Sequence, residues 1–515
     1  MPLLHSLIEF GGSQKWRAAE TWLVLSICLT ILVAVRVVRA RRAARFAVLH
    51  GCKPIKGQFP HIPLAFGLDF IIQNIRAFRR NGFLDLLRSR HAAYGNTFSA
   101  RALARRGVFT IDPDNVKTVL AGRFQDYCLG DRPPIMGQLL GKGIFVSDGE
   151  EWSHSRALLR PNFVKDQIAD LSLINGHIED LLKLVHNNQL VDLQPLFLHF
   201  TLDSATEFLF GRSTNLLGTN TAADKAFSDS FNASLKDMAL QFRMGPIRKL
   251  RQRNPEVAEA HRICRSYVDQ FVESALQMRK HATESDTKPT TEHDRNFFLR
   301  ELAKSTDDKE KIRDEILNIL IAGRDTVASL LSSLFFVLAR RPEIWNNVKN
   351  EVAQLKGELP TYDQLRDLKY IRYCINETLR LYPPVPSNTR VSVRDTVLPR
   401  GGGPNGEDPI HIPSGGVVIY SVFAMHRRKD LFGEDAEEFR PERWESRKFS
   451  WEYIPFNGGP RICLGQQYAI TEASLVLIRF AQEFSTIWSE DSSEWKENLT
   501  LTLTPAGGVN VYLAR

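Results

Sequence analysis

The sequence predicts a mainly α-helical protein with a minor β region, preceded by a single N-terminal transmembrane helix. Three observations predict this fold class. Apolar residues recur at helical spacing in the middle of the chain, as in 172–185 and 258–278. Strand-like alternation is confined to short runs such as 389–398 and 416–421. A long apolar run lies close to the N-terminus.

Composition limits the classes of function. The chain has 515 residues, of which 43% are hydrophobic and 24% charged, so it can bury a large core. Its six cysteines are scattered without a CxxC pair, which argues against a disulfide scaffold or a zinc cluster and for a reducing compartment. The net charge of +8 is modest, and no basic run is interleaved with aromatic residues. Nucleic-acid binding is therefore not expected.

The apolar run begins at Thr21. Residues 21–35 carry no charge, and two valines after Arg36 extend the run to about 18 residues, near the lower limit for crossing a bilayer. Five arginines follow between residues 36 and 45, whereas only Lys15 and Arg17 precede the run closely. By the positive-inside rule, the C-terminal side faces the cytosol. A cleaved signal peptide is the alternative, but its basic region would precede the apolar run.

The domain organisation follows from this segment. We expect residues 1–20 to be a short lumenal N-terminus and residues 21–38 to be a signal anchor in the endoplasmic reticulum membrane. Residues 39–63 are basic and then contain three prolines, so they predict a stiff linker. Residues 64–515 show no repeat and form the catalytic domain.

A glycine-rich string at residues 401–406 matches G-x-G-x-x-G. A dinucleotide site needs a strand before this string and a helix starting within it, whereas Pro404 interrupts it here. We interpret it as a loop between two short strands, and no NAD(P)H site is inferred.

Residues 307–340 predict one long helix. Asp307 or a neighbour can cap it, with Glu310 placed for a capping box. Residues 316–338 are almost wholly apolar, which predicts a buried helix. The sequence Ala-Gly-Arg-Asp-Thr at 322–326 interrupts this run, and Thr326 can divert a backbone hydrogen bond and open a groove. The alternative is a buried Arg–Asp pair beside a back-bonded threonine.

The stretch 456–465, Phe-Asn-Gly-Gly-Pro-Arg-Ile-Cys-Leu-Gly, places Cys463 in a tight turn with a cation two residues upstream. Gly459 and Gly465 allow backbone angles that other residues avoid. Turn amides can point at the sulfur, lower its pKa and keep it ionised. A free cysteine in a glycine-rich surface turn is the ordinary alternative. The whole pattern favours a metal-bound thiolate at Cys463.

This turn resembles the haem-ligand loop of the cytochrome P450 superfamily, F-x-x-G-x-R-x-C-x-G. Phe456, Gly459, Arg461, Cys463 and Gly465 match its fixed positions. The resemblance implies a P450 fold and haem b (iron protoporphyrin IX), with Cys463 as the axial thiolate ligand of the iron. It also implies that Arg461 bonds a haem propionate and that Phe456 packs near the sulfur.

The resemblance assigns roles to further residues. Asp325 and Thr326 match an acid–threonine motif, so they are the expected catalytic pair, relaying protons during oxygen activation. Trp152 and Arg156 match W-x-x-x-R, whose members hold a propionate, and Arg390 is another propionate contact, less securely placed.

Glu377 and Arg380 match the family's E-x-x-R element, and Arg443 is its third member. Their spacing alone fits an ordinary surface ion pair. The resemblance implies a structural set, buried together behind the haem. Glu315, eleven residues before Thr326, has the offset at which some fatty-acid hydroxylases of the superfamily esterify a haem methyl, although a paired or solvated glutamate is commoner.

The closest resemblance is to fungal n-alkane and fatty-acid hydroxylases, over 149–161, 191–211, 318–326 and 439–473. It implies insertion of one oxygen atom of O2 into a C–H bond of a lipophilic substrate, at or near the end of a fatty acid or alkane. NADPH electrons would come from a separate NADPH-cytochrome P450 reductase, and membrane lipid would be a further partner. Oxidation of a polyketide, terpenoid or other secondary metabolite is the alternative, and a non-catalytic haem-thiolate sensor is a third.

Overall fold

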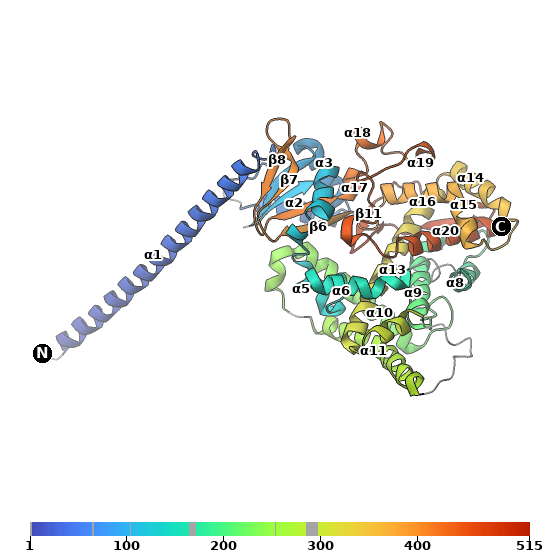
Figure 1. The fold of residues 1–515 in the computed structure, drawn as a ribbon, viewed down its shortest axis with the longest axis horizontal. Helices are drawn as coiled ribbons and strands as arrows, with labels where there is room; N and C mark the ends of the chain where they lie inside the picture. The colour runs from blue at the N-terminus through green and yellow to red at the C-terminus, as the bar shows by residue number, and fades with distance from the viewer. Residues whose placement is uncertain (1–2, 64–65, 104, 164–170, 253, 285–296) are drawn as a thin grey trace.

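The structure is a computed structural model that describes residues 3–63, 66–103, 105–163, 171–252, 254–284 and 297–515. A helical body carries a smaller β region at one end, and one long helix, α1, extends away from the body (Figure 1). The predicted fold class, mainly α with a minor β region, is confirmed.

Helix α1 (Leu3–Leu49) contains the predicted membrane segment. An 18-residue window within its Thr21–Leu49 stretch has a mean hydropathy of 2.3, so the stretch is long and apolar enough to cross a membrane. The linker was expected to begin at residue 39, but the helix continues as far as Leu49. The basic stretch 39–49 is therefore helical. Only the following segment is non-helical, and there the Lys53 amide donates to the Pro409 carbonyl at 2.8 Å.

The main sheet is six-stranded and mixed. Its strand order is β1 (Gly57–Gln58), β2 (Thr97–Ala102), β3 (Arg105–Thr110), β9 (Val417–Ser421), β6 (Ser387–Ser392) and β4 (Tyr127–Cys128). The β1–β2 and β3–β9 pairs are parallel and the others antiparallel. The strand-like runs expected near 389–398 and 416–421 thus lie in this sheet and the hairpin beside it.

Three smaller sheets complete the β region. A hairpin pairs β7 (Thr396–Gly402) with β8 (Asp408–Ile412), so the glycine-rich string joins two strands, as predicted. The other sheets are formed by β10 (Thr486–Trp488), β13 (Asn510–Ala514) and β5 (Val191–Asp192), and by β11 (Glu497–Leu499) and β12 (Leu503–Pro505).

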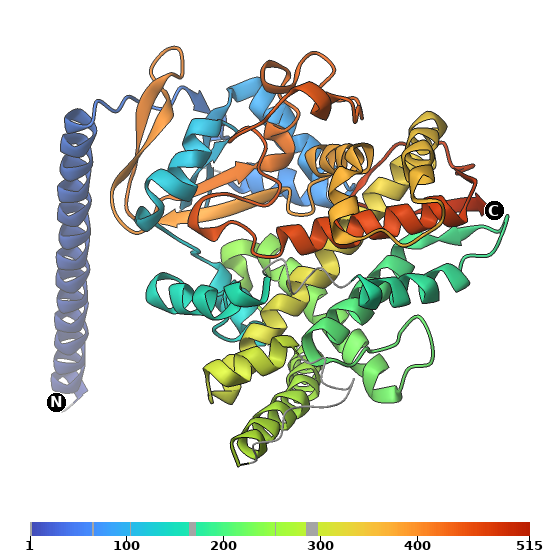
Figure 2. The ribbon, with the colours of Figure 1, turned by 45° about the vertical axis from the view of Figure 1, so that its right-hand side comes forward.

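The helices of the body surround α13, which crosses it diagonally (Figure 2). Their bounds are α2 (Leu68–Arg79), α3 (Phe83–Tyr94), α4 (Pro113–Lys117), α5 (Arg132–Leu140), α6 (Gly149–Leu159), α8 (Ser172–Lys183), α9 (Leu193–Phe210), α10 (Ala222–Met244), α11 (Pro255–Glu284), α12 (Phe297–Ser305), α13 (Lys309–Leu338), α14 (Pro342–Val352), α15 (Tyr362–Asp367), α16 (Lys369–Leu381), α17 (Val422–Met425), α18 (Lys429–Phe432), α19 (Arg443–Ser446) and α20 (Gln466–Glu483).

Helix α13 begins and ends close to the predicted limits. Asp308 caps it by accepting from the Lys311 amide at 3.0 Å. The predicted capping box with Glu310 is wrong, because Lys311 and not Glu310 occupies the third helical position.

The two halves of α13 pack into different hydrophobic cores. Residues up to Ile321 pack with α5, α10, α11 and α12, whereas residues from Val327 onward pack with α8, α14, α16 and α20. The interrupting sequence at 322–326 falls between the two cores. The interruption of the apolar run in the sequence therefore coincides with the part of α13 that belongs to neither core.

Candidate active site

The cysteine turn, residues 456–465, leads directly into α20. A short 3-10 helix covers Gly459–Arg461, and the Cys463 amide donates to the Phe456 carbonyl at 3.0 Å. Gly459 has φ +67°, and a Cβ there would lie 1.9 Å from the Leu120 carbonyl oxygen, so only glycine fits. The same need was predicted for Gly465, but that residue has φ −87° and caps α20 in an ordinary conformation.

Cys463 is exposed, yet the protein atoms packed around its thiol keep much water away from the sulfur. Burial raises its pKa, while the Gly465 amide and the nearby Arg156 charge act in the opposite direction. The predicted lowering of the pKa by turn amides is outweighed here by burial. Coordination to a metal would favour the ionised sulfur.

One stripe of α13 also keeps accessible surface although the helix around it is buried. Ile319, Ala322, Gly323 and Thr326 are partly exposed, and they follow the i, i+3, i+4, i+7 spacing of one helical face. Helix α13 packs against α20, which the cysteine turn precedes. The stripe and the cysteine turn therefore belong to chain segments that the packing of α13 on α20 brings together.

Thr326 of this stripe is also a member of the acid–threonine pair. The Thr326 hydroxyl donates to the Ala322 carbonyl at 2.6 Å, which is the back-bonding expected from the sequence. Asp325 is buried and accepts from Arg324 Nη1 at 2.9 Å, and Arg324 Nη2 donates to Asn232 at 2.6 Å. Burial raises the pKa of Asp325 in spite of this partner. Asp325 thus contacts Arg324, and no contact in the described part of the chain joins its carboxylate to the Thr326 hydroxyl.

Three arginines gather near the cysteine turn, and we call them the cation cluster: Arg132, Arg390 and Arg461. Arg132 and Arg390 both donate to Asn388 Oδ1, at 2.7 and 3.1 Å. Arg461 donates to Asp148 Oδ1 at 2.8 Å and lies 4.5 Å from the Trp152 ring centroid. Burial, with repulsion among the three charges, lowers the pKa of Arg132 and of Arg461 to about 10.

The three arginines of the cation cluster carry more positive charge than nearby carboxylates neutralise. Asp148 forms the one ion pair that the described residues make with the three guanidiniums. Partly desolvated cations in such excess are stabilised by an anionic group. Two haem propionates would supply this charge, and Cys463 would supply a soft sulfur ligand, so the residues fit the haem that the resemblance implies.

Two of these residues were not identified from the sequence. Arg132 begins α5 and Asp148 precedes α6, and no motif or periodicity marks either of them. Arg390, the least secure sequence prediction, lies in β6 and belongs to the cluster.

The two members of the W-x-x-x-R pair contact different parts of the site. The Trp152 ring packs under Arg461. Arg156 instead donates to the Ile462 carbonyl at 3.0 Å, one residue before Cys463. Arg156 therefore contacts the cysteine turn in this structure, and its role as a propionate ligand stays a prediction.

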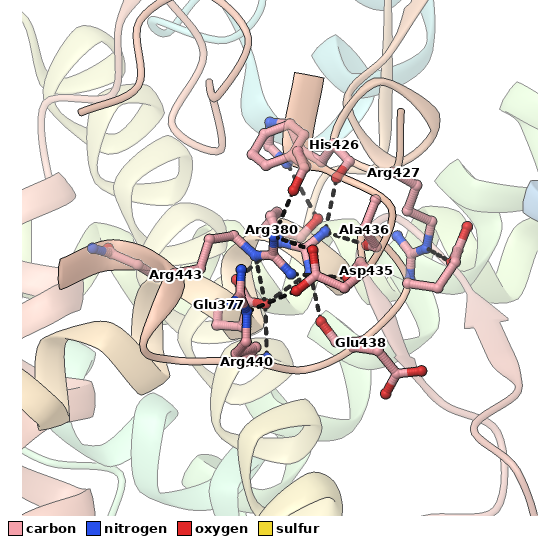
Figure 3. A network of polar contacts seen from close by, with 12 residues as sticks. Glu377, Arg380, His426, Arg427, Asp435, Ala436, Glu438, Arg440 and Arg443 are labelled. Atoms are coloured by element: carbon pink, nitrogen blue, oxygen red, sulfur yellow. Dashed lines mark hydrogen bonds and ion pairs between the residues drawn. The ribbon is translucent and has the colours of Figure 1, made fainter. Parts of the chain in front are cut away.

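Glu377, Arg380 and Arg443 meet in a buried network (Figure 3). Arg380 Nε and Nη2 donate to the two Glu377 carboxylate oxygens at 2.9 and 2.8 Å, and Arg443 Nε donates at 3.3 Å. The remaining Arg380 N–H groups donate to the carbonyls of His426, Ala436 and Glu438. These carbonyls belong to the segment after β9, which passes around α16. The spacing alone fitted a surface pair, but Glu377 and Arg380 have no exposed surface.

Glu315 has protein partners. Its carboxylate forms an ion pair with Lys311 at 2.9 Å and accepts from the Ile144 amide at 3.1 Å, and the residue is fully buried. These contacts correspond to the ordinary paired glutamate that was the commoner expectation.

Comparison with known proteins agrees with this geometry. The family model described as Cytochrome P450 matches residues 63–510. The chain is 56% identical to the cytochrome P450 monooxygenase himC of Aspergillus japonicus, over 99% of this chain and 94% of the relative. It is 50% identical to the cytochrome P450 monooxygenase fsdH of Fusarium heterosporum, over 98% and 90%. It is 43% identical to cytochrome P450 52A1 of Candida tropicalis, over 78% of each chain.

Proposed function

Because this chain belongs to the cytochrome P450 family, we propose that it is a membrane-anchored monooxygenase that hydroxylates a long aliphatic substrate, a fatty acid or an alkane. The family establishes the coarser statements: the chain is a haem-thiolate monooxygenase that receives electrons from a redox partner and uses O2. The substrate class, the reductase and the organelle are the proposal.

The observation that carries the substrate proposal is the accessible stripe of α13. Its members are Ile319, Ala322, Gly323 and Thr326, so it presents aliphatic or small surface with a single hydroxyl. That hydroxyl already donates to the Ala322 carbonyl. Such a face offers no charged anchor for a polar group near the reacting carbon, and it suits a hydrocarbon chain.

A haem bound through Cys463 would supply the activation of O2, of which one atom enters the C–H bond while the other is reduced to water with the electrons from NADPH. The chain's own residues hold this group and deliver protons. The cation cluster would hold the propionates, and Arg156 would keep the Ile462 carbonyl and hence the cysteine turn in place. Asp325, with its pKa raised by burial, would hold a proton that Thr326 passes to the reacting oxygen. A rotation of either side chain is needed, because Asp325 contacts Arg324 instead.

We propose that α1 crosses the endoplasmic reticulum membrane once, with the catalytic body on the cytosolic face. The basic stretch after the apolar run supports this orientation. Apolar residues of α2, among them Ile72 and Ile75, are exposed, as is Phe242 near the end of α10. Arg243 lies 5.3 Å from the Phe78 ring centroid, so the C-terminal ends of α10 and α2 meet. Epitope tags at the two ends of the chain, probed with protease in intact microsomes, test the orientation, and a protected C-terminal tag would overturn it.

We propose NADPH-cytochrome P450 reductase as the electron donor. Arg156 donates to the Ile462 carbonyl beside Cys463, Arg160 lies near Arg156, and Lys448 is exposed between α19 and the cysteine turn, so these basic residues suit an acidic flavin domain. From the sequence we predict a basic face around Cys463 that also includes Arg461 and Lys165. Arg461 faces inward to Asp148, and Lys165 lies outside the described residues. Lys448→Glu should slow the first electron transfer from reductase in stopped-flow measurements, and an unchanged rate would place docking elsewhere.

The substrate proposal is tested with full-length protein, reductase and NADPH. Dodecanoic acid, hexadecanoic acid, hexadecane and fungal metabolite extracts serve as substrates, with products identified by mass spectrometry and Cys463→Ser as the control without the thiolate. We expect terminal or near-terminal alcohols from the aliphatic substrates. Turnover of an extract component without turnover of any aliphatic chain would favour the secondary-metabolite alternative. The names of the himC and fsdH relatives specify only a monooxygenase, so that alternative is tested on equal terms.

A further inference from the structure

Two serines of this sequence have an arginine three positions upstream. They are Ser446, with Arg443, and Ser450, with Arg447. Serine kinases that select basic segments recognise a cation at this position, because acidic side chains of their substrate cleft pair with it. Ser450 also has a second cation, Lys448, two positions upstream. The sequence alone therefore offers two candidate sites of phosphorylation, just before the cysteine turn.

The structure separates these two serines. Arg443 is buried in the charge network, where it forms ion pairs with Glu377 at 3.3 Å and with Asp435 at 2.9 Å (Figure 3). Ser446 is the last residue of helix α19. A kinase would have to open the buried network to reach the cation upstream of Ser446. This serine is therefore a poor substrate in spite of its spacing.

The cations upstream of Ser450 are accessible. Arg447 and Lys448 are both exposed, and neither forms an ion pair within the described part of the chain. The Arg447 guanidinium lies 4.8 Å from the Phe449 ring centroid, and this contact involves no carboxylate. Both positive charges are therefore available to an acidic partner.

Ser450 itself is accessible as well. Its side chain is exposed, and its hydroxyl makes no hydrogen bond to the residues that the structure describes. Residues 447–450 belong to neither a helix nor a strand, and Arg447 has the extended angles φ −118° and ψ 129°. An enzyme can therefore bind this segment without first unwinding a helix or separating two strands.

A phosphate on Ser450 would lie beside the cysteine turn. The next residue, Trp451, packs on Gly458 of that turn, because a Cβ added at Gly458 would lie 2.6 Å from the Trp451 ring. Arg447 and Lys448 give the segment 447–450 a charge of +2. A phosphoserine adds about −1.5 to −2 at pH 7. The modification would therefore cancel the positive charge of this segment.

We propose that a cytosolic serine kinase that recognises basic residues phosphorylates Ser450, and that the phosphate slows electron delivery. The Ser450 Oγ forms a bond to the γ-phosphorus of ATP, and the bond from that phosphorus to the β–γ bridging oxygen breaks. ADP leaves, and the hydroxyl proton passes to a carboxylate base of the kinase. The effect on electron delivery rests on the topology and the docking surface proposed above, because the phosphate repels the acidic domain that Lys448 attracts.

The first experiment measures the modification. Full-length holoenzyme in phospholipid nanodiscs is incubated with ATP and the catalytic subunit of cyclic-AMP-dependent protein kinase, a basic-directed serine kinase, and phosphopeptides are mapped by mass spectrometry. We expect phosphate on Ser450 and none on Ser446. Arg447→Gln should slow incorporation about tenfold or more, because it removes a charge-assisted pair with the kinase. Arg76→Gln, which removes an exposed arginine of α2, is the matched control and should leave incorporation unchanged.

The second experiment measures reduction of the haem by reductase and NADPH in stopped flow, before and after kinase treatment. Phosphorylation should slow reduction of the wild type about threefold or more at low ionic strength and less at high ionic strength, because salt screens charges. Ser450→Ala, treated in the same way, should show no change. The carbon monoxide spectrum of each protein verifies its fold.

Three results would overturn the proposal. An unmodified Ser450, or a Ser446 modified as fast as Ser450, would show that the exposed cations do not select the site. A reduction rate that the phosphate leaves unchanged, or lowers equally at every ionic strength, would exclude the effect on docking. Absence of reduction before kinase treatment would contradict the proposed electron donor and the effect on its docking, whereas the phosphopeptide map would still decide the site.

Discussion

Glu377 is the residue whose replacement tests the buried network most directly. Its carboxylate accepts from five N–H groups: Arg380 Nε and Nη2, Arg443 Nε, the Arg440 amide and the Trp444 indole. Glu377→Ala would leave two guanidiniums buried next to each other without their shared anion. The remaining carbonyl partners of Arg380 cannot replace a negative charge.

The expected cost is large compared with the stability of a folded protein. Removing one partner of a buried ion pair costs about 3–5 kcal/mol. That is a fifth or more of a typical net stability of roughly 5–15 kcal/mol. At about 1.4 kcal/mol for each factor of ten, the ratio of folded to unfolded protein falls by about a hundred- to several-thousandfold. Glu377→Gln keeps the shape and one acceptor oxygen, so it should lie between the alanine variant and the wild type.

The assay combines the carbon monoxide difference spectrum per milligram of protein with the midpoint of urea unfolding followed by circular dichroism. Glu445→Ala is the matched control, because Glu445 is an exposed carboxylate on the adjacent helix α19. We expect Glu377→Ala to lose most bound haem and to unfold at a lower urea concentration, with the control unchanged. Wild-type haem content and midpoint in Glu377→Ala would refute the view that these charges are stable only as a set.

Three further predictions concern the haem environment and the core. Thr326→Ala should raise hydrogen peroxide formed per NADPH consumed by several-fold, because the hydroxyl that would relay a proton is lost, whereas Ser332→Ala, which removes a similarly back-bonded hydroxyl of α13, should not. Arg132→Leu should speed the transfer of haem to apomyoglobin, because one cation near the propionates is removed, and an unchanged rate would exclude Arg132 from holding the haem. Burial raises the pKa of Glu472 from 4.5 to about 7, so this residue makes stability fall as pH rises from 4.5 through 7 and then level off. Denaturant titrations should show that Glu472→Gln flattens this slope, and an equal slope in both proteins would contradict the assignment.

The sequence predicted the fold class because its signals are local. Helical periodicity, the capped apolar run of α13 and the glycine-rich hairpin loop each depend on residues close in sequence. The errors are also local and small. The cap of α13 lies one residue later than the position that a capping box with Glu310 requires, and α1 continues into the first part of the expected linker, to Leu49, because nothing in 39–49 breaks a helix.

The site could be predicted only where a motif carries it. Cys463 and the E-x-x-R pair are recognisable from short patterns, but the burial of the E-x-x-R pair is not, since the chain after β9 must first wrap around α16 to supply carbonyls to Arg380. The cation cluster has no such pattern. Arg132 and Arg390 meet at the Asn388 side chain from segments far apart in sequence, and only the folded chain brings them together.

The gap between the two cores along α13 has a consequence for how such enzymes diversify. Ala322, Gly323 and Thr326 are only partly buried, and a methyl group added at Gly323 would meet Ala205 at an ordinary 3.7 Å. Exchanges among small residues at these positions should therefore cost little folding free energy while reshaping the surface that a substrate touches. Natural selection can then alter the product of the reaction here without first having to compensate for a weakened protein.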